Sequence, residues 1–141
     1  MLQTFTKKHR GFTLIELLVV IAIIGILSAI VLVSLGGART KAKDAAIKAN
    51  MDSMRLAAEV FYTDGLTYTG VNLDTSYVNA RAAITGGDIL PSGGGVTDNI
   101  IAAAYCVKVD LNDGTDWCLD STGYVGATAV CDAVNADCAT D

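Results

Sequence analysis

Four cysteines are the residues of this 141-residue chain whose chemistry is easiest to define. Cys106, Cys118, Cys131 and Cys138 all lie in the last 36 residues. An even number of cysteines in a small exported domain indicates two disulfides. Zinc sites need closely spaced pairs, usually with histidine, whereas 11, 12 and 6 residues separate these cysteines and the sole histidine is His9. We expect two disulfides, no metal site and no cofactor.

A single carboxylate interrupts a long apolar segment. From Phe12 to Leu35, a run of 24 residues, the only charge is Glu16. About 20 apolar residues of helix cross a bilayer, so this segment is long enough to do so. A carboxylate at the centre of such a helix costs roughly 2.5–3.5 kcal/mol and less near an end. A charge retained there is therefore a candidate functional group.

Charged residues flank the apolar segment on both sides. Before it stand Lys7, Lys8, His9 and Arg10, and after it Arg39, Lys41 and Lys43. A basic start favours a cytoplasmic N-terminus, but the near flanks are balanced in lysine and arginine. The cysteines decide the orientation, because disulfides persist outside the cytosol. We expect the start inside and the C-terminal part outside.

Other chemistries fit the residues less well. The stretch 110–116 resembles a calcium loop, but Gly114 is fifth instead of sixth and no glutamate follows at the required distance, which favours a plain turn. From Leu56 onward there are two basic and twelve acidic residues, which disfavours direct nucleic-acid binding. The sole histidine, His9, stands before the apolar segment, so a histidine-based triad is excluded from the residues that follow it. We expect that this chain is not an enzyme.

The apolar segment and its continuation predict one long helix ending near Tyr62. No proline interrupts it, although Gly36-Gly37 can hinge or weaken it. Apolar residues after this pair step by four and three, a spacing that forms one helix face. These are Ile47, Met51, Met54, Ala58 and Phe61. We expect this face to pack on the rest of the domain.

The remaining residues predict a loop and a small antiparallel sheet. Residues 63–99 are rich in glycine and read as a loop, with a possible short helix over 76–84. Strands are expected within 100–110 and 117–119, joined by a turn at 112–114, with a third over 124–130. A hairpin centred on residue 112 would place Cys106 opposite Cys118. Of three possible connectivities we favour this pair, with Cys131 bonded to Cys138.

The start of the apolar segment resembles the class III signal of type IV prepilins and pseudopilins. In that family a basic leader ends in glycine, phenylalanine follows, and glutamate is fifth; here these are Gly11, Phe12 and Glu16. The likeness covers residues 7–32. It implies that a prepilin peptidase cuts between Gly11 and Phe12 and methylates the Phe12 amine. It also implies that Glu16 pairs with the Phe12 ammonium of a neighbouring subunit during assembly.

The resemblance implies a pilin-like α+β fold, in which a long N-terminal helix packs on a small antiparallel sheet with disulfides. The expected segments are a cleaved leader (1–11), a transmembrane or filament-core helix (12–35), its amphipathic half (36–62), and a globular head (63–141), with the sheet and disulfides in 100–141. One departure is that this apolar run has Gly25 but lacks the proline many pilins carry.

The function implied is a structural subunit of a type IV pilus-like surface filament. Expected partners are copies of itself, prepilin peptidase, the inner-membrane assembly platform and motor, and membrane lipid before assembly. The precursor is expected in the inner membrane, and the assembled filament at the cell surface. Alternatives are a pseudopilin of a type II secretion-like machine, a minor pilin, and a membrane-anchored binding domain that does not polymerise.

Overall fold

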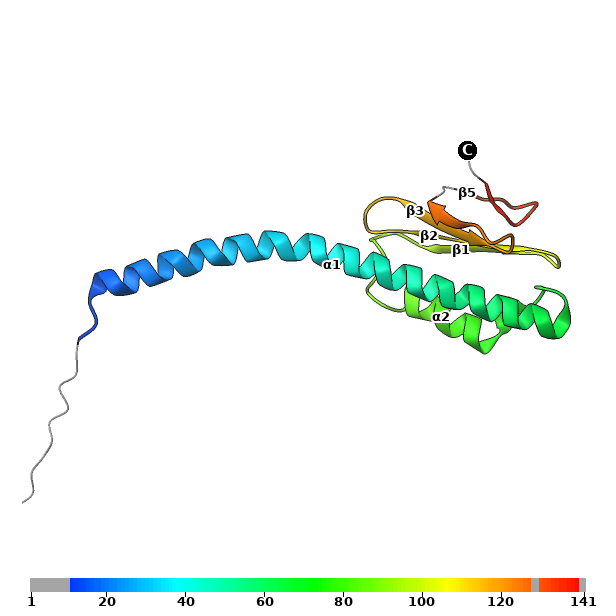
Figure 1. Cartoon of the computed structure of the whole chain (residues 1–141), viewed down its shortest axis with the longest axis horizontal. Helices are drawn as coiled ribbons and strands as arrows, with labels where there is room; N and C mark the ends of the chain where they lie inside the picture. Colours follow the sequence, from blue (N-terminus) through cyan, green and yellow to red (C-terminus); the bar gives the residue numbers. More distant parts are fainter. Residues whose placement is uncertain (1–10, 128–129, 140–141) are drawn as a thin grey trace, which may run out of the picture. The chain divides into compact units, whose positions relative to one another are not determined.

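The computed structural model of the chain describes residues 11–127 and 130–139 (Figure 1). Except for Gly11, the expected leader lies outside these residues. The chain divides into two compact units, Met1–Gly37 and Ala38–Asp141. We call them the N-terminal unit and the head, and describe each by itself.

The helix α1 runs from Leu14 to Gly65, three residues beyond the expected end. Within the N-terminal unit, every described residue is exposed. By length and composition, α1 is the one helix among the described residues that could cross a membrane. Gly25 lies inside this helix, and a Cβ added there would meet nothing within 4 Å. The helix is thus regular at Gly25, in an apolar run that lacks the proline many pilins carry.

The second half of α1 carries the main hydrophobic core of the head. The predicted stripe is confirmed, since Ile47, Met51, Met54 and Ala58 are all fully buried and Phe61 packs against the core at its edge. These side chains meet the fully buried Tyr105, Val107, Val109 and Leu119 of the sheet. Burying large apolar side chains stabilises a fold by about 1.5–3 kcal/mol each, so this stripe is a main source of head stability.

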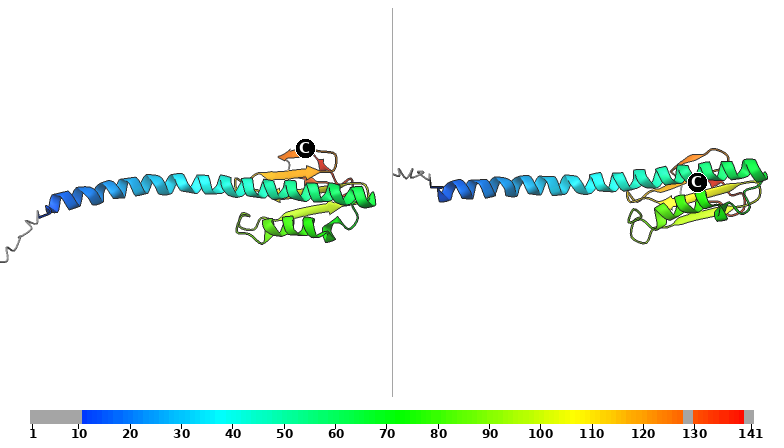
Figure 2. Two further views of the ribbon diagram at one scale, coloured as in Figure 1. Left: turned by 60° about the horizontal axis from the view of Figure 1, so that its bottom comes forward. Right: turned by 90° about the horizontal axis from the view of Figure 1, so that it is seen from below.

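A second helix, α2, covers another part of the same core. It runs from Thr75 to Thr85, after the 3-10 helix η1 (Val71–Leu73), and confirms the short helix expected near 76–84. Asp74 is its N-cap and accepts hydrogen bonds from the backbone N–H groups of Ser76 (2.8 Å) and Tyr77 (3.1 Å). α2 buries Tyr77, Ala80 and Ile84 in the core. Figure 2 shows α2 beside the second half of α1 in both views.

The sheet contains four antiparallel strands in the order β1-β2-β3-β4. Their bounds are Val96–Ile100, Tyr105–Asp110, Asp116–Asp120 and Val125–Ala127. The expected hairpin is confirmed as β2–β3. Of the third strand expected over 124–130, residues 125–127 form β4, residues 128 and 129 lie outside the described residues, and Val130 belongs to another strand. Strand β1 lies within 63–99 apart from its last residue, so the expectation that this segment is a loop, apart from one helix, is wrong. A separate ribbon pairs β5 (Val130–Cys131) with β6 (Cys138–Ala139).

The predicted disulfide connectivity is wrong. The bonds join Cys106 to Cys131 and Cys118 to Cys138, with Cα–Cα distances of 5.8 and 6.0 Å. The hairpin is centred on residue 113, so Cys106 lies opposite Asp120 and Cys118 opposite Lys108. The two hairpin cysteines are therefore diagonal neighbours, about 7–8 Å apart, which is too far to bond. Each instead bonds to the ribbon.

The head consequently has three layers. One face of the sheet packs on α1 and α2, and the other carries the β5–β6 ribbon (Figure 1). Cys106, Cys118, Ala136 and Cys138 are buried in a second small core beneath the ribbon. The two disulfides join this ribbon to the sheet.

Candidate functional site

The start of α1 holds the residues to which the sequence assigned processing and assembly. Gly11, Phe12 and Thr13 precede the helix, and Glu16 lies in its first turn. The Phe12 side chain is 73% exposed, and no neighbouring side chain approaches within 4 Å of a Cβ built on Gly11. The peptide bond between Gly11 and Phe12 is thus accessible within this unit.

The Glu16 carboxylate is held by Thr13. Its Oε2 accepts hydrogen bonds from the Thr13 backbone N–H (2.9 Å) and hydroxyl (2.8 Å). The Glu16 backbone N–H in turn donates to the Thr13 hydroxyl (3.3 Å). This reciprocal pattern is a capping box, which satisfies N–H groups left unpaired at the start of a helix. In the uncut chain Glu16 therefore stabilises its own helix.

Sequence reasoning missed this capping role, although its signal was present. The tetrapeptide from Thr13 to Glu16 has the T-x-x-E form that marks a capping box before an apolar run. The structure brings Glu16 to Thr13, and it contains no free Phe12 ammonium because Gly11 still precedes Phe12. Pairing of Glu16 with that ammonium therefore remains a prediction for the cut chain.

An apolar surface extends from this point along the N-terminal unit. Phe12, Ile15, Glu16, Val19 and Val20 line a shallow groove of about 370 Å³. Further along the helix are small side chains that allow close approach of another helix: Ala22, Gly25, Ser28, Ala29 and Ser34. Because no described part of this unit buries these residues, water contacts them unless lipid or another helix covers them.

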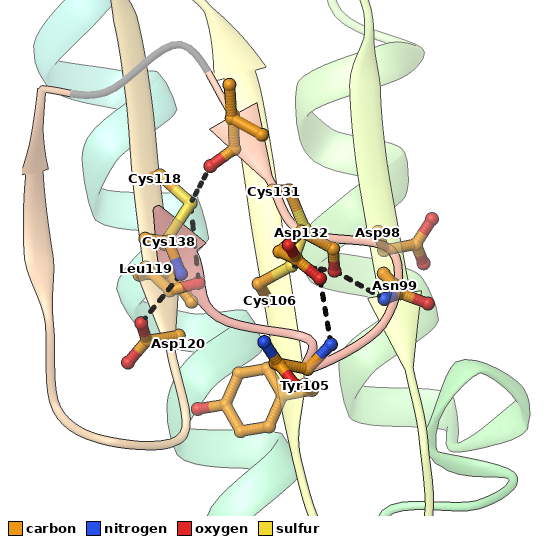
Figure 3. The surroundings of a disulfide bond; sticks show 12 residues. Asp98, Asn99, Tyr105, Cys106, Cys118, Leu119, Asp120, Cys131, Asp132 and Cys138 are labelled. Carbon is orange, nitrogen blue, oxygen red and sulfur yellow. Dashed lines mark hydrogen bonds between the residues drawn. A yellow bond between two sulfur atoms is a disulfide. The ribbon is translucent and has the colours of Figure 1, made fainter. Parts of the chain in front are cut away.

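A polar anchor in the head holds the ribbon against the sheet (Figure 3). Asp120, only 2% exposed, accepts hydrogen bonds from the backbone N–H of Cys138 (2.9 Å) and Tyr124 (3.1 Å). It also accepts from the backbone N–H (2.9 Å) and hydroxyl (2.7 Å) of Thr122. On the other side, the Asn99 amide donates to the Asp132 carbonyl (2.7 Å). Asp120 thus joins the β3–β4 turn to β6.

The electrostatics of Asp120 follow from these contacts. Burial acts to raise its pKa, but the hydrogen bonds from Thr122, Cys138 and Tyr124 outweigh burial and lower it below the ordinary 3.8. The carboxylate is therefore charged at neutral pH, and both of its oxygens accept hydrogen bonds within the fold. This arrangement serves structure, because no position on Asp120 is open to a substrate.

Comparisons with known proteins agree with these observations. A family profile described as the prokaryotic N-terminal methylation motif matches residues 6–32. The type IV wide pilus major component PilA4 of Thermus thermophilus is 32% identical over 114 residues, which cover 79% of this chain and 80% of that protein. No solved structure matches.

Other relatives match over shorter stretches. The type IV major pilin protein PilA of Myxococcus xanthus is 37% identical over 46% of this chain and 30% of its own length. The type II secretion system core protein G of Escherichia coli is 36% identical over 48% of this chain and 46% of its own length. The likeness to PilA4, in contrast, extends over most of both chains. In this chain a methylation motif precedes a long helix and a disulfide-bonded head. The chain belongs to the type IV pilin family.

Proposed function

We propose that the chain is a structural subunit of a type IV pilus-like filament, held in the inner membrane before assembly. The observation that carries the proposal is the N-terminal unit, whose apolar residues are all exposed and directly follow the motif at Gly11 and Phe12. In a bilayer this surface is covered by lipid, and in a filament by the same helix of other copies. The head is acidic and therefore suits an exposed position.

The proposed assembly chemistry begins with cleavage by prepilin peptidase between Gly11 and Phe12. Cleavage releases the Phe12 amine, which that enzyme methylates. Glu16 then exchanges its hydrogen bonds with Thr13 for the Phe12 ammonium of a neighbouring copy. The platform and motor of the inner membrane move the subunit out of the bilayer, with the head outside and the start of the precursor in the cytoplasm.

Intact mass spectrometry on sheared surface filaments, without reduction, tests this proposal. We expect a chain beginning at methylated Phe12, lighter by four hydrogens because of two disulfides. The same cut chain confined to the membrane fraction would favour a pseudopilin. An uncut chain, or one cut after the apolar segment, would contradict the proposal.

Two substitutions of Glu16 separate its charge from its capping role. Glu16→Gln keeps an oxygen that can accept from Thr13 but removes the charge, and Glu16→Ala removes both. If pairing with the ammonium drives assembly, both variants insert in the membrane and neither forms filaments. Thr13→Ala is the control that removes the two hydroxyl hydrogen bonds of the capping box and keeps the Glu16 charge, and it should still form filaments. Filament formation by Glu16→Gln at the normal level would refute the charge-pairing role.

A pseudopilin of a type II secretion machine is the second candidate. It is favoured by the 36% identity to core protein G over 67 residues and by the absence of the late proline from the apolar run. The two candidates share cleavage and membrane insertion and differ in the length of the polymer. The sheared fraction therefore distinguishes them.

A further inference from the structure

A groove in the head combines exposed apolar side chains with acidic residues. It has a volume of about 290 Å³ and lies between the last turns of α1 and the start of α2. Leu56 and Val60, 66% and 54% exposed, form its apolar wall. Asp64 and the N-cap Asp74 also line it.

The opposite end of the head portion of α1 carries unpaired positive charge. Arg39 and Lys41 are exposed, and neither forms an ion pair within the part of the chain that the structure describes. They lie on either side of Ala38 and Ala42, which are four residues apart and share one helix face. The result is a pair of small apolar side chains flanked by two cations, which we call the basic strip (residues 38–42).

The groove and the basic strip carry charges of opposite sign and side chains of different size. The strip presents small side chains where the groove presents the large Leu56 and Val60. The Asp64 side chain makes no hydrogen bond or ion pair among the described residues, so its charge is as unpaired as those of Arg39 and Lys41. Asp74 uses only Oδ1 for both of its capping bonds. Pairing these groups would also offset the mutual repulsion of acidic heads.

We propose that the groove binds the basic strip of a second copy of this chain, an inference that rests on the proposed function. The two surfaces are different, so the contact is head-to-tail. Because each joined copy is also shifted along the helix axis, the contact repeats without closing and produces a filament. With parallel helices, placing Ala38 and Ala42 opposite Leu56 and Val60, 18 residues further along the helix, corresponds to a shift of about 27 Å along α1 between the joined copies. The contact thus sets one axial spacing of the polymer.

Charge reversal tests the pairing. In full-length chains expressed in the native host, Asp64→Lys alone and Arg39→Glu with Lys41→Glu should each lower sheared filament by about tenfold or more. Combining all three changes should restore filament. Asp137→Lys, an equal change of charge on the ribbon, is the matched control and should assemble normally. Normal assembly of Asp64→Lys, or no recovery in the combined variant, would overturn the proposal.

A folding control and a crosslinking experiment make the result specific. Membrane-fraction abundance and mobility on a non-reducing gel show whether each variant is folded with its disulfides intact. A photoreactive benzoylphenylalanine at Ser53, which lines the groove, should crosslink to the peptide containing residues 38–43 of another copy. A crosslink to residues 12–35, or none between copies, would contradict the docking. Because copies in the membrane can crosslink, this readout decides the docking even if the wild type forms no filament and the proposed function fails.

Discussion

Replacing Asp120 should destabilise the head more than any comparable change of an exposed aspartate. Asp120→Ala removes the acceptor for four hydrogen bonds. Three of the four donors belong to the β3–β4 turn, where water can replace the carboxylate, and their loss costs about 0.5–1 kcal/mol each. The fourth, the Cys138 N–H, is buried and is left unpaired at a cost of about 1–3 kcal/mol. We expect a total loss of about 2.5–6 kcal/mol.

Urea unfolding of the full-length, oxidised protein in detergent measures this loss. The fluorescence of Trp117, the sole tryptophan and a residue of β3, reports on the sheet. Asp113→Ala is the matched control, because Asp113 accepts two hydrogen bonds from Thr115 in an exposed turn. Its effect should be clearly smaller. Equal unfolding midpoints for the two variants would refute the anchoring role of Asp120.

The same carboxylate predicts a dependence of stability on pH. Because the folded state holds the pKa of Asp120 below 3.8, its contribution is fully present above that pH. The contribution is lost as pH falls through the lower folded-state value. Asp120→Asn lacks this component, so the difference in unfolding free energy between it and the wild type should shrink under strong acid. A difference that stays constant to the lowest pH would contradict the assignment.

Three further predictions concern other parts of the head. Reducing the disulfides should lower the unfolding free energy by about 2–4 kcal/mol per bridge, measured by Trp117 fluorescence with and without reductant; an unchanged midpoint would show that the bridges do not stabilise the head. Asp44→Ala should lower the unfolding free energy by about 2–4 kcal/mol in the same assay. The reason is that the buried Asp44 accepts hydrogen bonds from the Asn112 backbone N–H (2.7 Å) and side-chain amide (2.8 Å). A loss below about 1 kcal/mol would refute this role. Burial and the nearby Glu59 carboxylate raise the pKa of Tyr68 to about 12, so the component of the five-tyrosine absorbance titration that Tyr68→Phe removes should lie above pH 11. Glu59→Gln should lower this pKa, and an unchanged Tyr68 component in that variant would exclude the carboxylate as a cause.

The long helix, its buried stripe and the N-terminal motif could be predicted because each is a local pattern. Periodicity places Ile47, Met51 and Met54 on one face whatever the rest of the chain does. Strand β1 was missed because its sequence, Val-Thr-Asp-Asn-Ile, contains two residues disfavoured in strands. Its pairing with β2 provides the stability that local propensity does not.

The disulfide connectivity could not be predicted because it depends on register. Moving the hairpin centre by one residue, from 112 to 113, turns Cys106 and Cys118 from opposite neighbours into diagonal ones. The turn sets this register through Leu111 and Thr115, whose backbones hydrogen bond at 2.8 Å, and through Gly114 with its positive φ of 86°. Cys131 and Cys138 do lie opposite each other, yet each bonds to the sheet beneath.

The two disulfides overlap along the chain, because Cys118 lies between Cys106 and Cys131 and Cys131 lies between Cys118 and Cys138. Any single cut by a protease between Cys106 and Cys138 is therefore bridged by at least one bond, and no fragment leaves the head. The overlap also limits extension under a pulling force. Without the bonds, the segment from Cys106 to Cys138 could lengthen to about 110 Å, whereas the path through Cys131 leaves about 24 Å of chain. A subunit exposed at a cell surface would thus keep its head in one piece after enzymatic nicking and yield little length under tension.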